Sequence, residues 1–222
     1  MSWLLLNSGR SLPACNMAMD EALLENSSRL AQPVLRFYGW TEPAATFGYF
    51  QKFAELEQTT LLRPLIRRPT GGGLVPHDAD WTYSVLFPPG HEWYLLRAEE
   101  SYRRVHEWIQ KAFARMEIET ALAPCCQKSV PGQCFVGYEK HDLLWHGRKV
   151  AGAAQRRNKH GLLIQGSIQP PPISLSRTEW EQAMRVELKS DWTDLTPDAS
   201  LQARVAELEA VKYSQSAYNR KR

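Results

Sequence analysis

The stretch Leu65-Ile-Arg-Arg-Pro-Thr-Gly-Gly-Gly-Leu-Val-Pro-His-Asp-Ala-Asp-Trp-Thr-Tyr-Ser-Val-Leu-Phe87 joins two predicted strands through a glycine-rich loop. Branched and aromatic side chains predict the strands at Leu65–Arg68 and Trp81–Phe87. The three consecutive glycines of the loop, residues 69–78, leave backbone N–H groups free to approach an acyl carbonyl or a phosphate. The loop lacks the Gly-Lys-Ser/Thr ending of a P-loop, so the residues alone are equally compatible with a plain surface loop.

Further strands and helices are predicted on both sides of this stretch. Apolar residues at intervals of three and four predict helices, and β-branched or aromatic runs predict strands. The residues 34–40 and 44–50, separated by Thr-Glu-Pro, have a hairpin-like arrangement. We therefore expect an α+β fold, a mixed and mainly antiparallel sheet with packed helices, in a single domain over residues 1–222. The predicted helices are 16–30, 99–116, 177–188 and 201–211, and the other strands are 1–10, 142–145, 148–152 and 161–168.

The amino-acid composition is typical of a folded protein and does not indicate a particular binding partner. The chain has 222 residues, of which 43% are hydrophobic and 23% charged, and its net charge is +3. That charge is too small to predict a nucleic-acid groove. No apolar run reaches the roughly 20 residues of a membrane span, and no signal peptide is evident, so we expect a cytoplasmic protein. The four cysteines have no C-x-x-C spacing, which favours reduced thiols and no metal site.

Three side chains are candidates for chemistry. Lys149 lies among small residues in a predicted strand, where its ammonium can reach a carbonyl or phosphate oxygen, or can simply protect a sheet edge. Cys134 follows Pro-Gly-Gln in a predicted loop, although a free cysteine is usually inert. His77 follows the glycine loop, where a hydrogen-bonded structural histidine is more common than a catalytic base.

Taken in order, five segments resemble the superfamily of lipoate protein ligases, octanoyltransferases and biotin protein ligases. They are Pro13-Ala-Cys-Asn-Met-Ala-Met-Asp-Glu-Ala-Leu-Leu24, Leu35-Arg-Phe-Tyr-Gly-Trp40, Arg67-Arg-Pro-Thr-Gly-Gly-Gly73 with His77-Asp78, Gly147-Arg-Lys-Val-Ala-Gly152 and Gly166-Ser-Ile168. The resemblance implies the biotin/lipoate protein ligase catalytic-domain fold. It also implies that the glycine-rich segment and Lys149 surround a medium-chain acyl group.

Two features of the resemblance favour the octanoyltransferase branch. Cys134-Phe135 precedes Gly147-Arg-Lys149, which matches the nucleophile of octanoyltransferases that resemble lipoate ligases, and the chain ends without the accessory domain of many ligases. The implied catalytic residues are Cys134 and Lys149, and the implied substrate-binding residues are Arg68, Thr70, Gly71, Gly72, Gly73, His77, Asp142, Gly152 and Ala153. No metal ligand is implied.

The resemblance implies that octanoate passes from acyl carrier protein, through a Cys134 thioester, to a lysine of a lipoyl domain or glycine cleavage H protein, with no cofactor. The alternatives are an ATP- and Mg-dependent lipoate ligase acting through lipoyl-AMP, an amidotransferase between lipoyl domains, and a noncatalytic carrier-binding protein. His141-Asp142 stands where ligases tend to have Asn-Asp, so only the aspartate that helps to hold the Mg-adenylate is matched. A nucleic acid or a membrane is not an expected partner.

Two finer expectations concern the substrates. We expect the acyl chain to lie against residues 71–74 and the strand around Val150, because each buried methylene contributes about 0.8 kcal/mol. Basic residues are candidates for steering acidic carrier and lipoyl domains, with ordinary solvated charge as the alternative. These residues are Arg67, Arg68, Arg156, Arg157 and Lys159.

Overall fold

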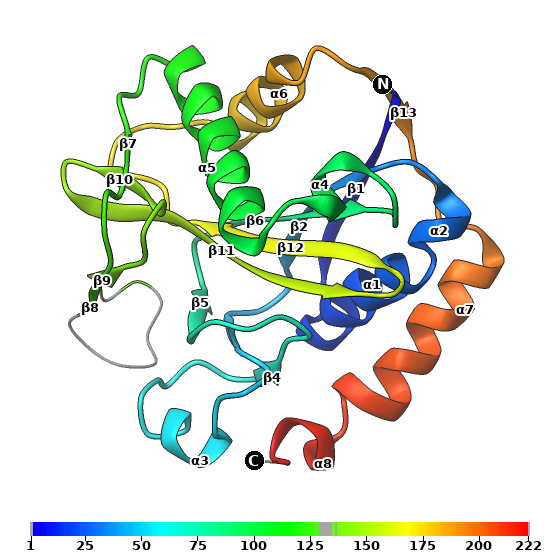
Figure 1. Ribbon diagram of the computed structural model, residues 1–222. Coiled ribbons are helices and arrows are strands. Elements are labelled where there is room, and N and C mark those ends of the chain that lie inside the picture. The colour runs from blue at the N-terminus through cyan, green and yellow to red at the C-terminus, as the bar shows by residue number, and fades with distance from the viewer. Residues whose placement is uncertain (1, 129–134, 136, 222) are drawn as a thin grey trace.

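The computed structural model describes residues 2–128, 135 and 137–221, and its centre is an eight-stranded sheet (Figure 1). Strand β1 lies parallel to β13 and β2, and each later neighbour pairs antiparallel, which confirms the mixed, mainly antiparallel sheet. The strand order is β13 (Asp191–Asp194), β1 (Ser2–Ser11), β2 (Val34–Trp40), β6 (Trp81–Phe87), β12 (Gly161–Ile168), β11 (Arg148–Asn158), β10 (Leu143–Trp145) and β7 (Ala121–Leu122).

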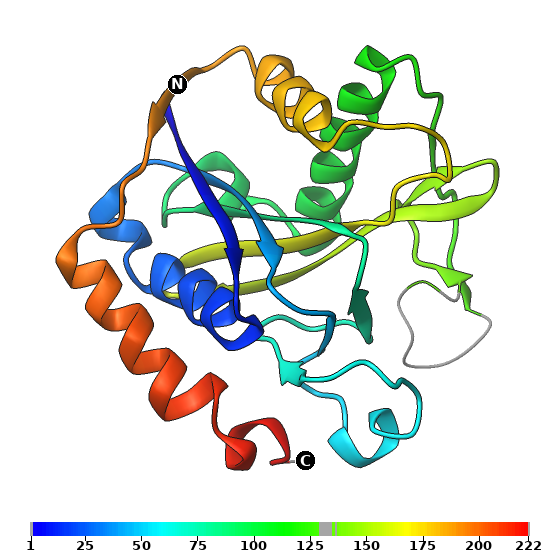
Figure 2. The same ribbon diagram turned by 180° about the vertical axis from the view of Figure 1, so that it is seen from behind.

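Helices cover both faces of this sheet, as the two opposite views in Figures 1 and 2 show. Helices α5 (Ala98–Arg115) and α6 (Arg177–Glu187) pack on one face, and α1 (Pro13–Glu25) and α7 (Ala199–Leu208) on the other. Side chains of a strand alternate between the two faces. On β12, Leu162 and Ile164 belong to the α5–α6 core, whereas Leu163 belongs to the α1–α7 core.

The predicted hairpin is wrong, because β2 and β3 (Ala44–Phe47) belong to different sheets. All seven residues of β2 are buried, and β1 and β6 flank it on its two edges. Strand β3 instead pairs with β4 (Leu65–Arg67) and β5 (Val75–His77) in a second, three-stranded sheet. A short polar turn fits both arrangements, so only the burial of β2 between two neighbours decides the pairing.

Other departures concern short elements and helix ends. Strand β5 lies inside the predicted loop, and β13 lies in a segment for which no strand was predicted. The first predicted helix divides into α1 and α2 (Ser27–Leu30). The remaining elements are α3 (Phe53–Leu56), α4 (Glu92–Leu95), β8 (Gln127–Lys128), β9 (Gly137–Tyr138), the π-helix η1 (Glu209–Tyr213) and α8 (Ser216–Asn219). Within the described ranges, no helix combines the length and the apolar character needed to cross a membrane.

Candidate active site

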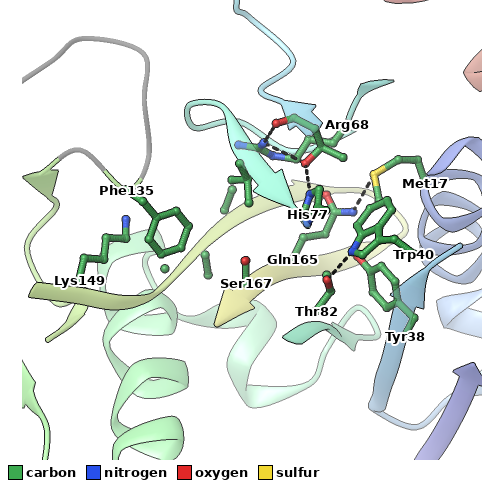
Figure 3. A pocket seen from close by; sticks show the side chains of 16 residues that line it. Met17, Tyr38, Trp40, Arg68, His77, Thr82, Phe135, Lys149, Gln165 and Ser167 are labelled. Atoms are coloured by element: carbon green, nitrogen blue, oxygen red, sulfur yellow. Dashed lines mark hydrogen bonds between the residues drawn. The ribbon is translucent and has the colours of Figure 1, made fainter. Parts of the chain in front are cut away.

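An elongated pocket lies between the main sheet, helix α1 and the small sheet (Figure 3). The pocket is partly open to solvent, and its free volume is about 40 Å³. Lys149 and Phe135 lie at one end, and Met17, Tyr38 and Trp40 lie at the other (Figure 3). The remaining lining residues are Thr46, Arg68, Val75, His77, Thr82, Gly152, Ala153, Ala154, Gln165, Gly166 and Ser167.

Lys149 is a buried cation inside the sheet and not an edge lysine, because β11 is flanked by β12 and β10. Its side chain is only 5% exposed, and its Nζ lies 2.7 Å from Oδ2 of the fully buried Asp142. The ammonium also lies 5.0 Å from the centre of the Phe135 ring. A buried ammonium needs such a partner, since an unpaired charge in this environment is very costly. The pair therefore fixes a positive charge at one end of the pocket.

The path of the Lys149 side chain depends on the absence of a side chain at Gly152. A Cβ added to Gly152 would lie 2.5 Å from Lys149 Cε and 2.6 Å from its Nζ. The same Cβ would lie 3.2 Å from Asp142 Oδ1. Gly152 thus provides the space in which lysine and aspartate meet, and Ala153 continues the pocket wall beside it.

The Asp142 carboxylate accepts two hydrogen bonds in addition to its ion pair with Lys149. The backbone N–H of Glu139 donates to Asp142 Oδ2 at 2.6 Å, and the hydroxyl of Tyr102 donates to Oδ1. Tyr102 comes from α5, where its helical spacing pointed only to packing in the core. Its position in sequence gave no signal of this contact, because Tyr102 and Asp142 are 40 residues apart.

Arg68 and Thr70 form the rigid base of the glycine-rich loop. Arg68 is buried, and its guanidinium donates to Thr70 Oγ1 at 3.1 Å and to the Gly71 carbonyl at 2.5 Å. The Thr70 hydroxyl donates in turn to Gln165 Oε1 at 2.7 Å. Gln165, which the sequence did not single out, lines the pocket in the middle of β12.

The three glycines have a different place from the one expected. Within the described residues, Gly71, Gly72 and Gly73 are not part of the pocket lining. Gly72 has a φ of 82° and its carbonyl packs against Gly48, where a Cβ would lie 1.9 Å from that oxygen. The loop is therefore folded back on residue 48. From this part of the chain, the residues that line the pocket are Arg68, Val75 and His77.

His77 is part of the pocket wall and is held at both ring nitrogens. Nδ1 donates to Asp80 Oδ2 at 2.9 Å, and Nε2 shares a 2.8 Å hydrogen bond with the Thr46 hydroxyl. The ring also stacks on Trp40, with 4.0 Å between centroids. Since both nitrogens are engaged, this arrangement matches the structural interpretation of His77 and not that of a free base.

The end of the pocket away from Lys149 rests on a buried polar network. Asp20 and Arg36 form an ion pair of 2.6 Å, and Gln165 Nε2 donates to Asp20 Oδ2 at 2.7 Å. Tyr38 donates to the same oxygen, and its burial raises its pKa well above the ordinary value. The phenol therefore stays protonated, and the end of the pocket carries no exposed charge.

Several expectations need correction or lie outside the described residues. Cys134 lies outside them, although Phe135, the next residue, lines the pocket. Leu74 and Val150 pack in hydrophobic clusters and do not line the pocket, whereas Gly152, Ala153 and Ala154 of the strand around Val150 do line it. Arg67 and Arg68 are buried and hydrogen-bonded within the protein, so neither offers an exposed guanidinium to a partner. Lys159 is exposed, and Arg156 and Arg157 are half-buried.

Comparisons with known proteins identify the family of the chain. The sequence model of the lipoyl protein ligase A/B catalytic domain matches residues 12–211. Octanoyltransferase LipM of Bacillus subtilis is 37% identical over 182 residues, and that of Halalkalibacterium halodurans is 36% identical over 180 residues. Each match covers 75% of this chain and 65% of the relative, so the chain spans about two thirds of the length of these relatives.

A solved structure shares the fold at lower sequence identity. The bi-partite lipoate protein ligase of Thermoplasma acidophilum, studied together with its E2 lipoyl domain, superposes with a TM-score of 0.75. It is 20% identical, and the match covers 99% of this chain and 96% of the ligase chain. This likeness confirms the expected lipoate ligase catalytic-domain fold.

Proposed function

Because the chain belongs to the lipoyl protein ligase A/B catalytic domain family, we propose that it is an octanoyltransferase acting in protein lipoylation. It takes an octanoyl group from acyl carrier protein and attaches it to a lysine of a lipoyl domain or of glycine cleavage H protein. Cys134 carries the acyl group between the two partners, and Lys149 stabilises the charges that form.

The observation that carries the proposal is the pocket with a single buried lysine at one end. The pocket wall also includes Val75, Ala153 and Ala154, which suit an aliphatic chain. An acyl group with its carbonyl at Lys149 has its tail directed towards Met17. Cys134 directly precedes Phe135 in the sequence, and the Phe135 ring faces the Lys149 ammonium.

The first step exchanges one thioester for another. The Cys134 thiolate attacks the carbonyl carbon of the octanoyl thioester and forms a C–S bond. The bond to the carrier's sulfur then breaks, and the released carrier thiolate takes up a proton. The Lys149 ammonium favours the thiolate and stabilises the oxyanion of the tetrahedral intermediate.

The second step forms an amide. The neutral ε-amine of the acceptor lysine attacks the acyl carbon, the C–S bond to Cys134 breaks, and the amine loses its proton as the thiolate leaves. The reaction is downhill because a thioester is replaced by an amide. The energy is already present in the donor thioester, so the transfer requires no nucleotide.

The residues around Asp142 do not fit a magnesium nucleotide while the Lys149 pair is intact. Oδ2 already accepts from Lys149 and Glu139, and Oδ1 accepts from Tyr102. Among the residues that the structure describes, no cluster of three or more His, Cys, Asp or Glu side chains is placed to hold a metal ion. The proposed mechanism includes no step through ATP.

Intact-mass spectrometry tests the proposal. Purified protein is mixed with octanoyl acyl carrier protein without ATP, alongside Cys134→Ala, Lys149→Ala and Cys125→Ala. The exposed Cys125 provides a matched control thiol in the same part of the sequence. We expect an octanoyl mass increase that hydroxylamine removes, present in Cys125→Ala, absent in Cys134→Ala and much slower in Lys149→Ala. Addition of a lipoyl domain then discharges the adduct.

Two results contradict the proposal. One is an adduct that persists in Cys134→Ala. The other is modification of a lipoyl domain only with lipoate and Mg-ATP, whether or not Cys134 is present, which identifies a ligase instead.

A further inference from the structure

Tyr102 touches the proposed catalytic pair from outside the pocket. Its hydroxyl donates to Asp142 Oδ1, while Asp142 Oδ2 accepts from Lys149 at 2.7 Å. Within the described part of the chain, Tyr102 is not among the residues that line the pocket. Any effect of this hydroxyl on the acyl group therefore passes through the carboxylate and the ammonium.

The phenol of Tyr102 is held in one orientation. The backbone N–H of Ala153, a pocket residue, donates to the Tyr102 oxygen at 3.4 Å, which leaves the hydroxyl proton for Asp142. The His106 ring lies 4.3 Å from the Tyr102 ring, and its Nδ1 hydrogen-bonds the Tyr102 carbonyl at 2.9 Å. Burial lowers the pKa of His106 to about 4, so this neighbour adds no positive charge near Lys149.

The same end of α5 also holds the backbone turn that carries Asp142. Glu99, one helical turn before Tyr102, binds Lys140 Nζ at 2.8 Å and His141 Nε2 at 3.3 Å. His141 has a φ of 71°, a conformation that non-glycine residues adopt only when their surroundings hold it. The N-terminal part of α5 thus contacts both the residues that precede Asp142 and the carboxylate itself.

We propose that Tyr102 is a positioning residue for the transfer, which holds the Asp142 carboxylate so that the Lys149 ammonium stays at the carbonyl end of the pocket. This inference rests on the proposed function for its effect on rate. Without the hydroxyl, Asp142 Oδ1 loses its side-chain donor, the carboxylate can rotate, and the ammonium moves with it. A hydrogen bond to a charged group at such a site corresponds to a loss of about 10- to 100-fold in rate.

Two measurements on Tyr102→Phe test the proposal, with Tyr94→Phe as the matched control. Tyr94 also donates a hydrogen bond through its phenol, at 3.1 Å to the Asn158 carbonyl, but it lies outside the site. The first measurement is octanoyl transfer by Tyr102→Phe, Asp142→Asn and the double variant. We expect Tyr102→Phe to lower kcat about 10- to 100-fold with little change in KM. The double variant should be no slower than Asp142→Asn alone, because Tyr102 acts through that carboxylate.

The second measurement does not depend on enzymatic activity. Acetylation by an amine-reactive ester is followed lysine by lysine with peptide mass spectrometry. In wild type, Lys149 is protected, since it is paired and 5% exposed. We expect Tyr102→Phe to increase its reactivity several-fold, with no change at exposed Lys159 or at Lys212, which is paired with Glu21 elsewhere in the fold.

Each outcome decides between the alternatives. Unchanged Lys149 reactivity in Tyr102→Phe overturns the proposal, and so do additive losses of rate in the double variant. Equal gains in reactivity at Lys149 and Lys212 also overturn it, because they indicate general loosening. A wild-type protein that transfers no octanoate while Lys149 still responds to Tyr102→Phe refutes the proposed function and supports the positioning of Lys149.

Discussion

Replacing Gly152 with alanine tests how strongly the reaction depends on the position of Lys149. The new Cβ would lie 2.5 Å from Lys149 Cε, so this carbon must retreat by about 0.9 Å to reach an ordinary contact of 3.4 Å. A lysine end is flexible and can retreat, which displaces the ammonium from its 2.7 Å contact with Asp142. Because both partners are buried, weakening this pair also lowers the stability of the fold. A misplacement of about 1 Å at a reacting centre can cost roughly 100-fold in rate, or about 2.7 kcal/mol of activation free energy.

The assay is the initial rate of octanoyl transfer to a lipoyl domain, together with thermal unfolding. We expect Gly152→Ala to lose about two orders of magnitude in kcat/KM while it remains folded, with a Tm lowered by the weakened Lys149–Asp142 pair. Gly166→Ala is the contrasting variant, because its Cβ would lie 2.1 Å from the fully buried Tyr83 ring. A rigid ring cannot retreat, so overpacking there should cost about 1–3 kcal/mol of stability.

The reasoning about Gly152 is refuted if folded Gly152→Ala retains a rate within about threefold of wild type, since the predicted displacement then has no consequence.

Two further predictions concern the pocket end and pH. Met17→Ala enlarges the end of the pocket away from Lys149. In competition assays, the rate of decanoyl transfer relative to octanoyl transfer should therefore rise by up to about fourfold per added methylene. An unchanged chain-length preference contradicts this prediction. Burial lowers the pKa of His106 to about 4, against about 6.5 when unfolded, so the unfolded chain binds the proton more readily. The contribution of His106 to the free energy of unfolding is fully present above pH 6.5. It is lost as the pH falls towards 4, and the loss is about 2 kcal/mol between pH 7.5 and 5. Urea unfolding of His106→Gln should lack this part of the pH dependence, and identical curves for wild type and variant would exclude it.

Long buried segments were the parts of the fold most accessible from sequence. The strands at 81–87 and 161–168 are observed at the predicted bounds, and the helix predicted at 99–116 is α5, Ala98–Arg115. Their apolar periodicity is strong because these segments pack against the core along their whole length. The short strands β5 and β13 have few residues and depend on partners, so their local pattern gives little signal.

Some residues of the candidate site were recognisable in the sequence, and others were identified only in the structure. Lys149, Arg68, His77, Gly152 and Ala153 line the pocket, and they lie in sequence motifs with unusual small or charged residues. The supporting residues Tyr102, Gln165 and Met17 look like ordinary core or strand residues in the sequence. Only their neighbours in space distinguish them.

The sequence by itself determined the fold class, the family resemblance and the lysine at the centre of the site. These properties are local, since each depends on residue types at short spacing. Tertiary structure decided that β2 and β3 separate into two sheets, that the three glycines fold back on Gly48, and that Tyr102 reaches Asp142 from 40 residues away. The physical reason is that hydrogen bonds, ion pairs and close packing depend on distances of a few ångströms in space. Chain segments far apart in sequence meet at such distances only after the two hydrophobic cores have formed on either side of the sheet.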